Sequence, residues 1–344
     1  MDIEKRHKII LNKKKEIDDG IMEYVIELSS PVYLESGITA ESLKIRFRTY
    51  GALNASKGNA ILLFHPLSFG LEGFARPDQD KNWWTKLVGP GRCLDTGRYC
   101  LIIGSIPFLA EQIAPLSPEE EALFLTFGDV ARIQKNIVDY LGIPRLYAVT
   151  GGSYGAMAAL AFSVHFRTSV RHAIIISATH RAHTNQIMIR RVQEKILGFM
   201  RTNSDDTESI VGLVKLISLL HYRKLDIYES FLEDEPDIEG YLEQCREGMR
   251  AKADLRLYIN ALRMMNAFDV SEEIESGDFE LHIWAVPSDN MYTLEQHRAF
   301  YDYVARRGIK AHFSIIDSDK GHDAFLMDEE KLIPCFSKIL NREI

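Results

Sequence analysis

The sequence predicts an α/β protein in which helices flank a mostly parallel sheet and an additional helical lid is inserted into the chain. Three observations carry this prediction. Short apolar runs of strand length alternate with segments of helical periodicity. One stretch of about a hundred residues has helical periodicity and no strand pattern. A glycine-flanked serine directly follows one of the apolar runs, where a strand would turn sharply into a helix.

The predicted strands and helices alternate along most of the chain. Apolar runs typical of buried parallel strands occupy residues 60–65, 99–105, 146–150, 172–178, 280–286 and 311–316. Residues 22–29 and 43–50 resemble antiparallel strands at the leading edge of the sheet. Helical periodicity is found in residues 128–141, 154–166, 293–307 and 329–340.

The long helical stretch divides the predicted core. Residues 179–279 lie between two predicted strands and are too many for an ordinary crossover, so we expect them to form a helical lid. The α/β core then consists of residues 1–178 and 280–344. Because ligands of open α/β sheets bind beyond the carboxyl ends of the strands, the lid should cover that edge.

Composition excludes several classes of protein. The chain has 344 residues, of which 46% are hydrophobic and 26% charged, as in ordinary globular proteins rather than disordered ones. Its net charge of −8 argues against nucleic acid as a partner, since phosphate backbones are bound by surplus lysine and arginine. We therefore expect small-molecule substrates.

The N-terminal segment and the cysteines suggest a cytoplasmic protein. Basic residues cluster at positions 5–8 and 13–15 without a long apolar run, which predicts a solvated arm rather than a signal peptide or membrane segment. Cys93, Cys100, Cys245 and Cys335 lack the close pairing of zinc or redox motifs, so we expect reduced thiols and no metal.

The glycine-flanked serine is the predicted nucleophile. Gly151-Gly-Ser-Tyr-Gly155 follows a predicted strand and opens a predicted helix, the context of the nucleophile elbow in the α/β-hydrolase fold. Small residues are needed there because the turn is crowded and its serine is held in a strained conformation. Ser153 should therefore expose its hydroxyl above the sheet. A tight turn with an incidental serine is the alternative.

A serine hydroxyl needs a base, and the base needs an acid to hold it. In this fold the acid and then the histidine follow the serine along the chain. Asp289 and His322 meet that order, and each comes after a predicted strand. The alternative for both is a loop or capping role, as for the nearby aspartates Asp317 and Asp319.

Two backbone N–H groups must face the oxygen on which negative charge develops. One is expected from Tyr154, which follows the nucleophile. The other is expected from the loop after residues 60–65, where Pro66 has no N–H to donate. Leu67 is therefore the predicted second member of the oxyanion hole, unless this loop is merely a turn.

Several motifs together resemble the homoserine O-acetyltransferase family, whose members are acyltransferases of the α/β-hydrolase fold. The similarity extends over nearly the whole chain. Its motifs are Tyr50-Gly-Ala-Leu-Asn54, the loop at His65, Trp83-Trp-Thr-Lys-Leu-Val-Gly-Pro-Gly91, Asp95-Thr-Gly-Arg-Tyr99, Gly151-Gly-Ser-Tyr-Gly155 and Gly321-His-Asp-Ala-Phe-Leu326.

The resemblance implies substrates and residues that would bind them. It implies transfer of acetyl from acetyl-CoA to L-homoserine in methionine biosynthesis, with acetyl-CoA as co-substrate, no other cofactor, and a homodimer joined through the lids. His221-Tyr-Arg223 is similar to the family's Thr-Tyr-Arg motif, whose arginine holds the substrate carboxylate. Asp323 matches the position that receives the substrate ammonium.

The sequence departs from this family at three places around the predicted site. Gly104-Ser-Ile-Pro-Phe-Leu109 replaces a glycine-rich Asn-Val-Leu-Gly-Gly-Cys stretch, Tyr154 replaces a methionine, and Ala156 and Ala158 replace glycine and glutamine. These departures leave another alcohol or amine acceptor open. A serine hydrolase, such as an esterase or thioesterase, is the alternative enzyme because water can attack the same acyl-enzyme. A non-enzymatic binding protein is the third hypothesis.

Overall fold

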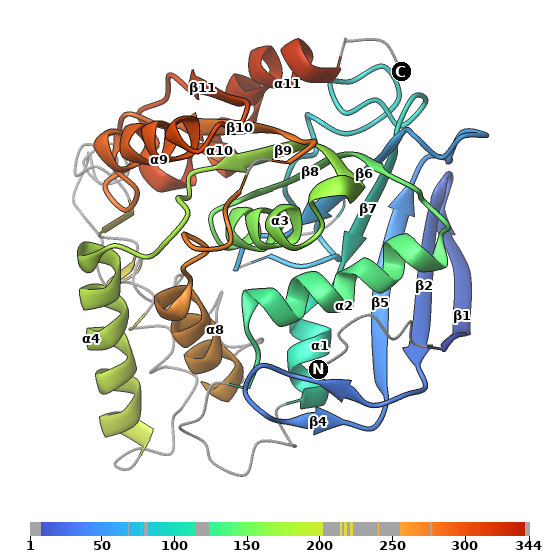
Figure 1. Cartoon of the computed structure of the whole chain (residues 1–344), viewed down its shortest axis with the longest axis horizontal. Helices are drawn as coiled ribbons and strands as arrows, with labels where there is room; N and C mark the ends of the chain where they lie inside the picture. The colour runs from blue at the N-terminus through green and yellow to red at the C-terminus, as the bar shows by residue number, and fades with distance from the viewer. Residues whose placement is uncertain are drawn as a thin grey trace.

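The computed structural model describes residues 8–67, 69–76, 78, 82–113, 124–201, 214, 217–218, 221–222, 240, 255–275 and 277–340. Its main element is a nine-stranded sheet (Figure 1). In spatial order the strands are β1 (Ile9–Asp18), β2 (Ile21–Leu28), β5 (Leu43–Tyr50), β7 (Cys100–Gly104), β6 (Ala60–Phe64), β8 (Leu146–Gly152), β9 (Val170–Ile176), β10 (Glu280–Ala285) and β11 (Ala311–Ile315). Short strands β3 (Val32–Tyr33) and β4 (Thr39–Ala40) pair separately.

Six strands, from β7 to β11 in the spatial order, are parallel, and β1, β2 and β5 are antiparallel at one edge. All eight predicted strands are confirmed, and the bounds differ from the prediction by no more than two residues at any end. The mostly parallel α/β sheet with a leading antiparallel edge is therefore as expected.

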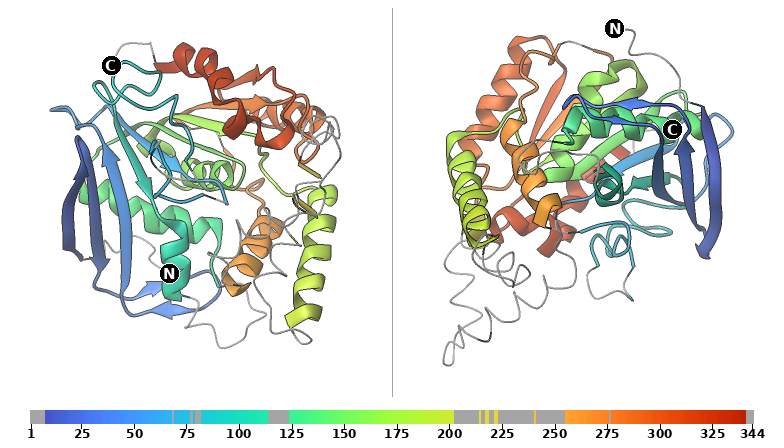
Figure 2. Two further views of the ribbon diagram at one scale, coloured as in Figure 1. Left: turned by 180° about the vertical axis from the view of Figure 1, so that it is seen from behind. Right: turned by 90° about the horizontal axis from the view of Figure 1, so that it is seen from below.

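Alternation along the parallel strands builds a core on each face of the sheet. In β6, Leu62 and Phe64 face one core, while Ile61 and Leu63 face the other. Helices α2 (Phe127–Tyr140) and α3 (Tyr154–His165) cover the first face, and α11 (Ile333–Leu340) packs with the second (Figures 1 and 2). The other helices among the described residues are α1 (Ile106–Ile113), α4 (Thr184–Arg201), α8 (Leu255–Ala267), α9 (Leu294–Arg306) and α10 (Ala324–Met327), with 3₁₀ turns at Arg167–Ser169, Gly321–Asp323 and Glu329–Leu332.

The prediction of a solvated N-terminal arm is wrong for residues 9–18, which form β1 and pair with β2. Side chains in the middle of β1 are exposed, including Lys13, Lys14 and Lys15. Pairing depends on backbone groups, so the like charges do not prevent it. Lysines on an edge strand also discourage pairing with another chain. Residues 1–7 lie outside the described residues.

Residues 104–109, which depart from the family's glycine-rich stretch, contain the end of β7 at Gly104 and the start of helix α1 at Ile106. One predicted helix needs correction in detail. The predicted helix over residues 329–340 is divided into a 3₁₀ turn and α11. Pro334 lies at the second position of α11, where its missing N–H costs little.

The described residues of the segment predicted as a lid include helices α4 and α8 and contribute no strand to the sheet. Most of residues 202–254 lie outside the described residues, so the lid and the domain bounds remain predictions. In the described part of the chain, no helix has the length and apolar character needed to cross a bilayer. Cys93, Cys100 and Cys335 are free thiols, and Cys245 lies outside that part.

Candidate active site

Ser153 occupies the sharp turn between β8 and α3. Its φ of 54° and ψ of −116° lie in a region that non-glycine residues rarely adopt. The neighbouring glycines permit this turn: a Cβ on Gly151 would lie 2.5 Å from the Gly155 carbonyl carbon, and one on Gly155 would lie 2.2 Å from the Phe64 oxygen. The Ser153 N–H donates to the Ile176 carbonyl of β9. The backbone of the strained serine is therefore bound to β9, and Gly155 lies against the end of β6.

His322 and Asp289 complete a hydrogen-bonded chain with this serine. His322 Nε2 lies 2.7 Å from Ser153 Oγ, and His322 Nδ1 lies 2.8 Å from Asp289 Oδ2. The other carboxylate oxygen of Asp289 accepts from the backbone N–H groups of Met291 and Tyr292. Asp289 and His322 are both buried. The three predicted residues thus lie in the arrangement that serine activation requires.

The loops that carry the acid and the histidine are held together by a buried serine. Ser288 Oγ donates to the Ser318 carbonyl and accepts from the Gly321 N–H, so it links the residue before Asp289 to the residue before His322. The Tyr292 ring stacks on the His322 imidazole, with centroids 5.6 Å apart. These contacts fix the imidazole plane relative to the serine.

The electrostatic surroundings favour the protonated form of the histidine. Burial alone lowers the pKa of His322, but the Asp289 carboxylate raises it, and Asp323 adds to the rise. The net result is a pKa above the ordinary value of 6.5. A basic imidazole that accepts the Ser153 proton is stabilised as the imidazolium by the same carboxylate.

The two predicted oxyanion donors belong to segments that meet where Gly155 of α3 packs against the end of β6. Tyr154 is the first residue of α3, where backbone N–H groups have no partner within the helix. Leu67 follows β6, whose last carbonyl, that of Phe64, is packed against Gly155. The close approach at Gly155 therefore brings the Leu67 loop to the N-terminus of α3.

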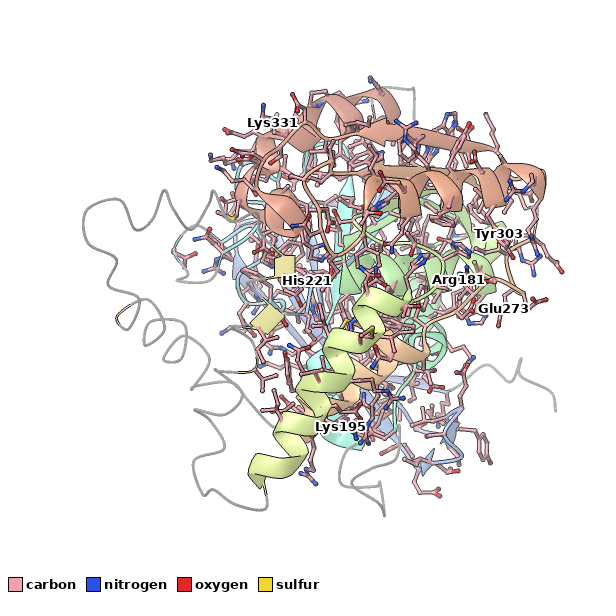
Figure 3. All side chains as sticks on the ribbon, turned by 90° about the vertical axis from the view of Figure 1, so that its left-hand side faces the viewer. Arg181, Lys195, His221, Glu273, Tyr303 and Lys331 are labelled. Carbon is pink, nitrogen blue, oxygen red and sulfur yellow. The ribbon has the colours of Figure 1, made fainter. Side chains whose placement is uncertain are left out.

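Of the two residues assigned to substrate binding, the structure describes Asp323 but not Arg223. Arg223 lies outside the described residues. Its neighbours His221, labelled in Figure 3, and Tyr222 are described, and the Tyr222 ring lies 5.2 Å from that of His322. Asp323 is half-buried and interacts electrostatically with both His322 and Tyr222.

With this geometry, comparison with known proteins decides the family. A family model described as alpha/beta hydrolase fold matches residues 80–326, well over half of the chain. This chain belongs to the α/β-hydrolase fold family.

Relatives of this α/β-hydrolase confirm the narrower resemblance. The homoserine O-acetyltransferase of Nautilia profundicola is 29% identical over an alignment that covers 93% of this chain and 98% of the relative. A solved homoserine O-acetyltransferase from Bacillus anthracis has a TM-score of 0.79 at 18% identity, covering 94% and 98% of the two chains. Esterase E22 has a TM-score of 0.81 at 16% identity, covering 93% and 100%.

Sequence reasoning missed Arg190, a buried arginine of α4 in this α/β-hydrolase. Its Nη2 lies 3.1 Å from the Tyr292 hydroxyl and its Nη1 3.3 Å from the Met265 carbonyl. Within the described part of the chain, no carboxylate lies within ion-pair distance of it. Its charge still acts on His322 and Tyr222. The motif signal pointed to Arg223 alone, because Arg190 lies in a charged helix that resembles a solvated one.

Sequence reasoning also missed the role of His65, which holds the Leu67 loop. Its Nδ1 lies 3.0 Å from the Pro66 carbonyl, and its Nε2 accepts from the Ile106 N–H at 3.1 Å. Both contacts suit one neutral tautomer, with the proton on Nδ1. Burial lowers the pKa of His65 to about 4, although bonds to the carbonyls of Pro66 and Phe69 oppose the shift.

Because His65 is buried and neutral, we expect the fold to lose stability in acid. Since the folded pKa of His65 lies below the ordinary 6.5, the unfolded chain binds more protons between these values. The stability that the neutral His65 contributes to the folded state is complete above pH 6.5 and is lost as the pH falls toward 4. Urea unfolding from pH 7.5 to 4.5 should show a His65→Gln variant whose stability falls less steeply than the wild type, by up to about 1.4 kcal/mol per pH unit. Identical slopes would contradict a neutral buried imidazole.

Proposed function

We propose that this protein is an O-acyltransferase that moves acetyl from acetyl-CoA to the hydroxyl of L-homoserine through an acyl-enzyme on Ser153. The observation that carries the proposal is the serine–histidine–aspartate hydrogen-bond chain in a buried site. This chain aligns over most of its length with relatives named homoserine O-acetyltransferase. That similarity supports acetyl as the transferred group and homoserine as the acceptor.

In the first half-reaction, His322 Nε2 takes the proton of Ser153 as its oxygen attacks the thioester carbonyl carbon. Asp289 holds Nδ1 so that Nε2 can accept, and it stabilises the imidazolium. The backbone N–H groups of Leu67 and Tyr154 bind the resulting oxyanion. The intermediate collapses, the C–S bond breaks, and the CoA thiolate leaves with the proton from His322.

In the second half-reaction, the acceptor hydroxyl gives its proton to His322 and its oxygen attacks the Ser153 ester. Collapse of this intermediate breaks the ester bond, and the Ser153 oxygen recovers the proton from the imidazolium. No redox step or metal ion is required. Acetyl-CoA therefore enters as a co-substrate, and we propose that no further cofactor is needed.

We propose that two cations and one carboxylate orient the acceptor. Arg223, by its similarity to the family motif, and Arg190, by its burial beside the Tyr292 hydroxyl, would face the substrate carboxylate. Asp323 would receive the ammonium, since it lies next to the base. An amino acid held at both charges would present its side-chain hydroxyl to the acylated serine.

Arg190→Met is expected to raise the acceptor KM about tenfold to a hundredfold, because a charge-assisted hydrogen bond contributes about 1.5 to 3 kcal/mol. Acylation by acetyl-CoA alone should change little, since it needs no acceptor. Arg191→Met is the matched control: this adjacent side chain is exposed and pairs with Glu194. Equal losses in both half-reactions would show instead that Arg190 supports the packing of α4 on the loop of Tyr292.

A serine hydrolase is the second candidate, favoured by the similarity to esterase E22 in fold. The two candidates differ in what removes the acyl group from Ser153. Release of CoA from acetyl-CoA should rise strongly on addition of L-homoserine, with O-acetylhomoserine as the product detected by mass spectrometry. Equal CoA release with and without homoserine, or with a panel of hydroxy amino acids, would favour the hydrolase.

We also propose a cytoplasmic homodimer joined through residues 179–279, active in methionine biosynthesis. The proposal rests on the similarity to homoserine O-acetyltransferases. Sedimentation would test the dimer directly.

A further inference from the structure

A cluster of imidazoles and one carboxylate lies in the sheet, away from the candidate active site. His172 of β9 is the register partner of Glu280, the first residue of β10, and His282 of β10 is the partner of His312 in β11. Glu280 and His282 are two positions apart in one strand, so all four side chains lie on the same face. We propose that His172, Glu280 and His282 bind a divalent transition-metal ion, Zn²⁺ by the chemistry of the set.

The distances suit such an ion. One ligand atom from each of the three residues lies within 4.8 Å of those from the other two. His172 Nδ1 and His282 Nε2 are 3.2 Å apart. Ligand atoms about 2.1 Å from a tetrahedral zinc ion are about 3.4 Å from one another, so the two imidazoles are already near the required separation. The carboxylate has to move closer, and each imidazole has to tilt so that its lone pair points at the ion rather than at the other ring.

Two histidines and one glutamate are a donor set that zinc accepts, with a fourth position for water. In the metal-free cluster one imidazole donates a proton to the other. Binding requires that this proton move to the second nitrogen of its own ring, so that both facing nitrogens offer lone pairs. The carboxylate of Glu280 supplies the negative charge that partly offsets the charge of the ion.

The cluster also has the surroundings of a metal ligand. His312 Nε2 lies 2.9 Å from Glu280 Oε2, and Lys310 forms an ion pair with Glu280 Oε1. Ligating carboxylates are commonly oriented by such outer hydrogen bonds. His312 stacks on His282 with ring centroids 4.7 Å apart, which fixes the plane of the ligating ring.

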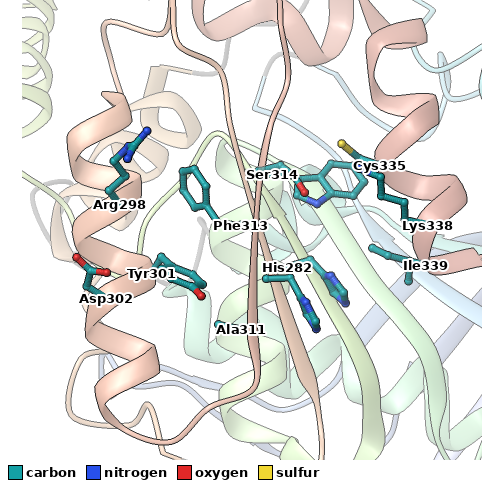
Figure 4. Close-up of a pocket in the computed structure, with 12 residues that line it drawn as sticks. His282, Arg298, Tyr301, Asp302, Ala311, Phe313, Ser314, Cys335, Lys338 and Ile339 are labelled. Atoms are coloured by element: carbon teal, nitrogen blue, oxygen red, sulfur yellow. The ribbon is translucent and has the colours of Figure 1, made fainter.

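An entry path reaches the cluster from the solvent. His282 and His312 line a cavity of about 630 Å³ beside edge strand β11. Figure 4 shows His282 between Tyr301 on the side of α9 and Lys338 on the side of α11. Because His172 and His282 are buried while His312 is partly exposed, an ion would enter past His312.

The position predicts a structural role rather than a catalytic one. Ser153, Asp289 and His322 follow the carboxyl ends of their strands, whereas Glu280 begins β10, so the strand separates the cluster from the site by about 10 to 17 Å. His172 and His282 are 110 positions apart and flank the inserted segment. Binding of the ion by the unfolded chain would require closure of that long loop, so the ion should bind the folded state selectively and stabilise it.

The test uses untagged full-length protein stripped of metal by a chelator. Equilibrium dialysis against micromolar Zn²⁺, followed by elemental analysis, should show one equivalent bound, and thermal unfolding should shift upward by about 3 °C or more. His282→Gln and Glu280→Gln should each bind at least tenfold more weakly. His165→Gln, which removes an exposed histidine at the end of α3, should bind like the wild type.

The outcomes are distinguishable even if one variant fails to fold, because Glu280→Gln then decides in place of His282→Gln. Co²⁺ provides an independent spectrum: intense visible bands without a thiolate charge-transfer band are expected for nitrogen and oxygen ligands. A wild-type protein that binds no Zn²⁺, variants that bind as tightly as the wild type, or a thiolate band would each overturn the proposal. Activity is not needed for any of these measurements.

Discussion

Replacement of Ser153 by alanine is expected to remove acylation by acetyl-CoA and to lower kcat/KM by about 10⁴-fold or more. The hydroxyl oxygen is the atom that forms the ester, and no other group replaces it. The alanine methyl should fit where the Ser153 side chain lies, and the N–H of residue 153 keeps its bond to the Ile176 carbonyl. Circular dichroism and thermal unfolding should therefore match the wild type.

The matched control is Ser163→Ala, which removes a buried hydroxyl of α3 that donates to the helix carbonyl of Ala159. This variant should keep full acylation. A fluorophosphonate probe should label the wild type and Ser163→Ala but not Ser153→Ala. Acylation that persists in Ser153→Ala would move the nucleophile to another residue.

Asp289→Asn is expected to lower kcat by about 10⁴-fold with little change in fold. The amide oxygen of asparagine can still accept from the N–H groups of Met291 and Tyr292, which bind one carboxylate oxygen now. The amide nitrogen would then face His322 Nδ1 and donate to it. That contact favours the tautomer with its proton on Nε2, which cannot accept the proton of Ser153.

The same variant predicts a change in pH dependence. In the wild type, the pKa of His322 lies above 6.5, so acylation should fall as the pH decreases through that raised value. Loss of the Asp289 charge lowers this pKa, and the acid limb of kcat/KM should move to lower pH. Rates of acylation from pH 5 to 9 give the position of the acid limb in the wild type and its shift in Asp289→Asn. An acid limb that stays in place would show that His322 is not the titrating base or that Asp289 does not act on it.

The strands and the turn at Ser153 could be predicted because each depends on local sequence, and the other two catalytic residues could be predicted from where the strands end. Short apolar runs such as β6 identify buried strands. Positions 151 and 155 must be glycine because the backbone passes too close to leave room for a side chain. Asp289 and His322 could be placed because the carboxyl ends of parallel strands meet at one edge of the sheet.

Features that depend on distant contacts could not be predicted in the same way. Strand β1 is specified by backbone pairing with β2, and its exposed lysines resemble those of a solvated arm. Arg190 becomes notable only because folding buries it against Tyr292, more than a hundred positions later in the chain. His65 likewise acquires its role from the N–H of Ile106.

The most direct test of the central claim is the mass of the protein itself during a single turnover. Wild-type protein mixed with acetyl-CoA and quenched in acid should gain one acetyl group on the peptide that contains Ser153. Addition of L-homoserine before the quench should remove that group much faster than water does and yield O-acetylhomoserine. A protein that gains no acetyl group, or loses it at the same rate with and without homoserine, would contradict transfer through this serine.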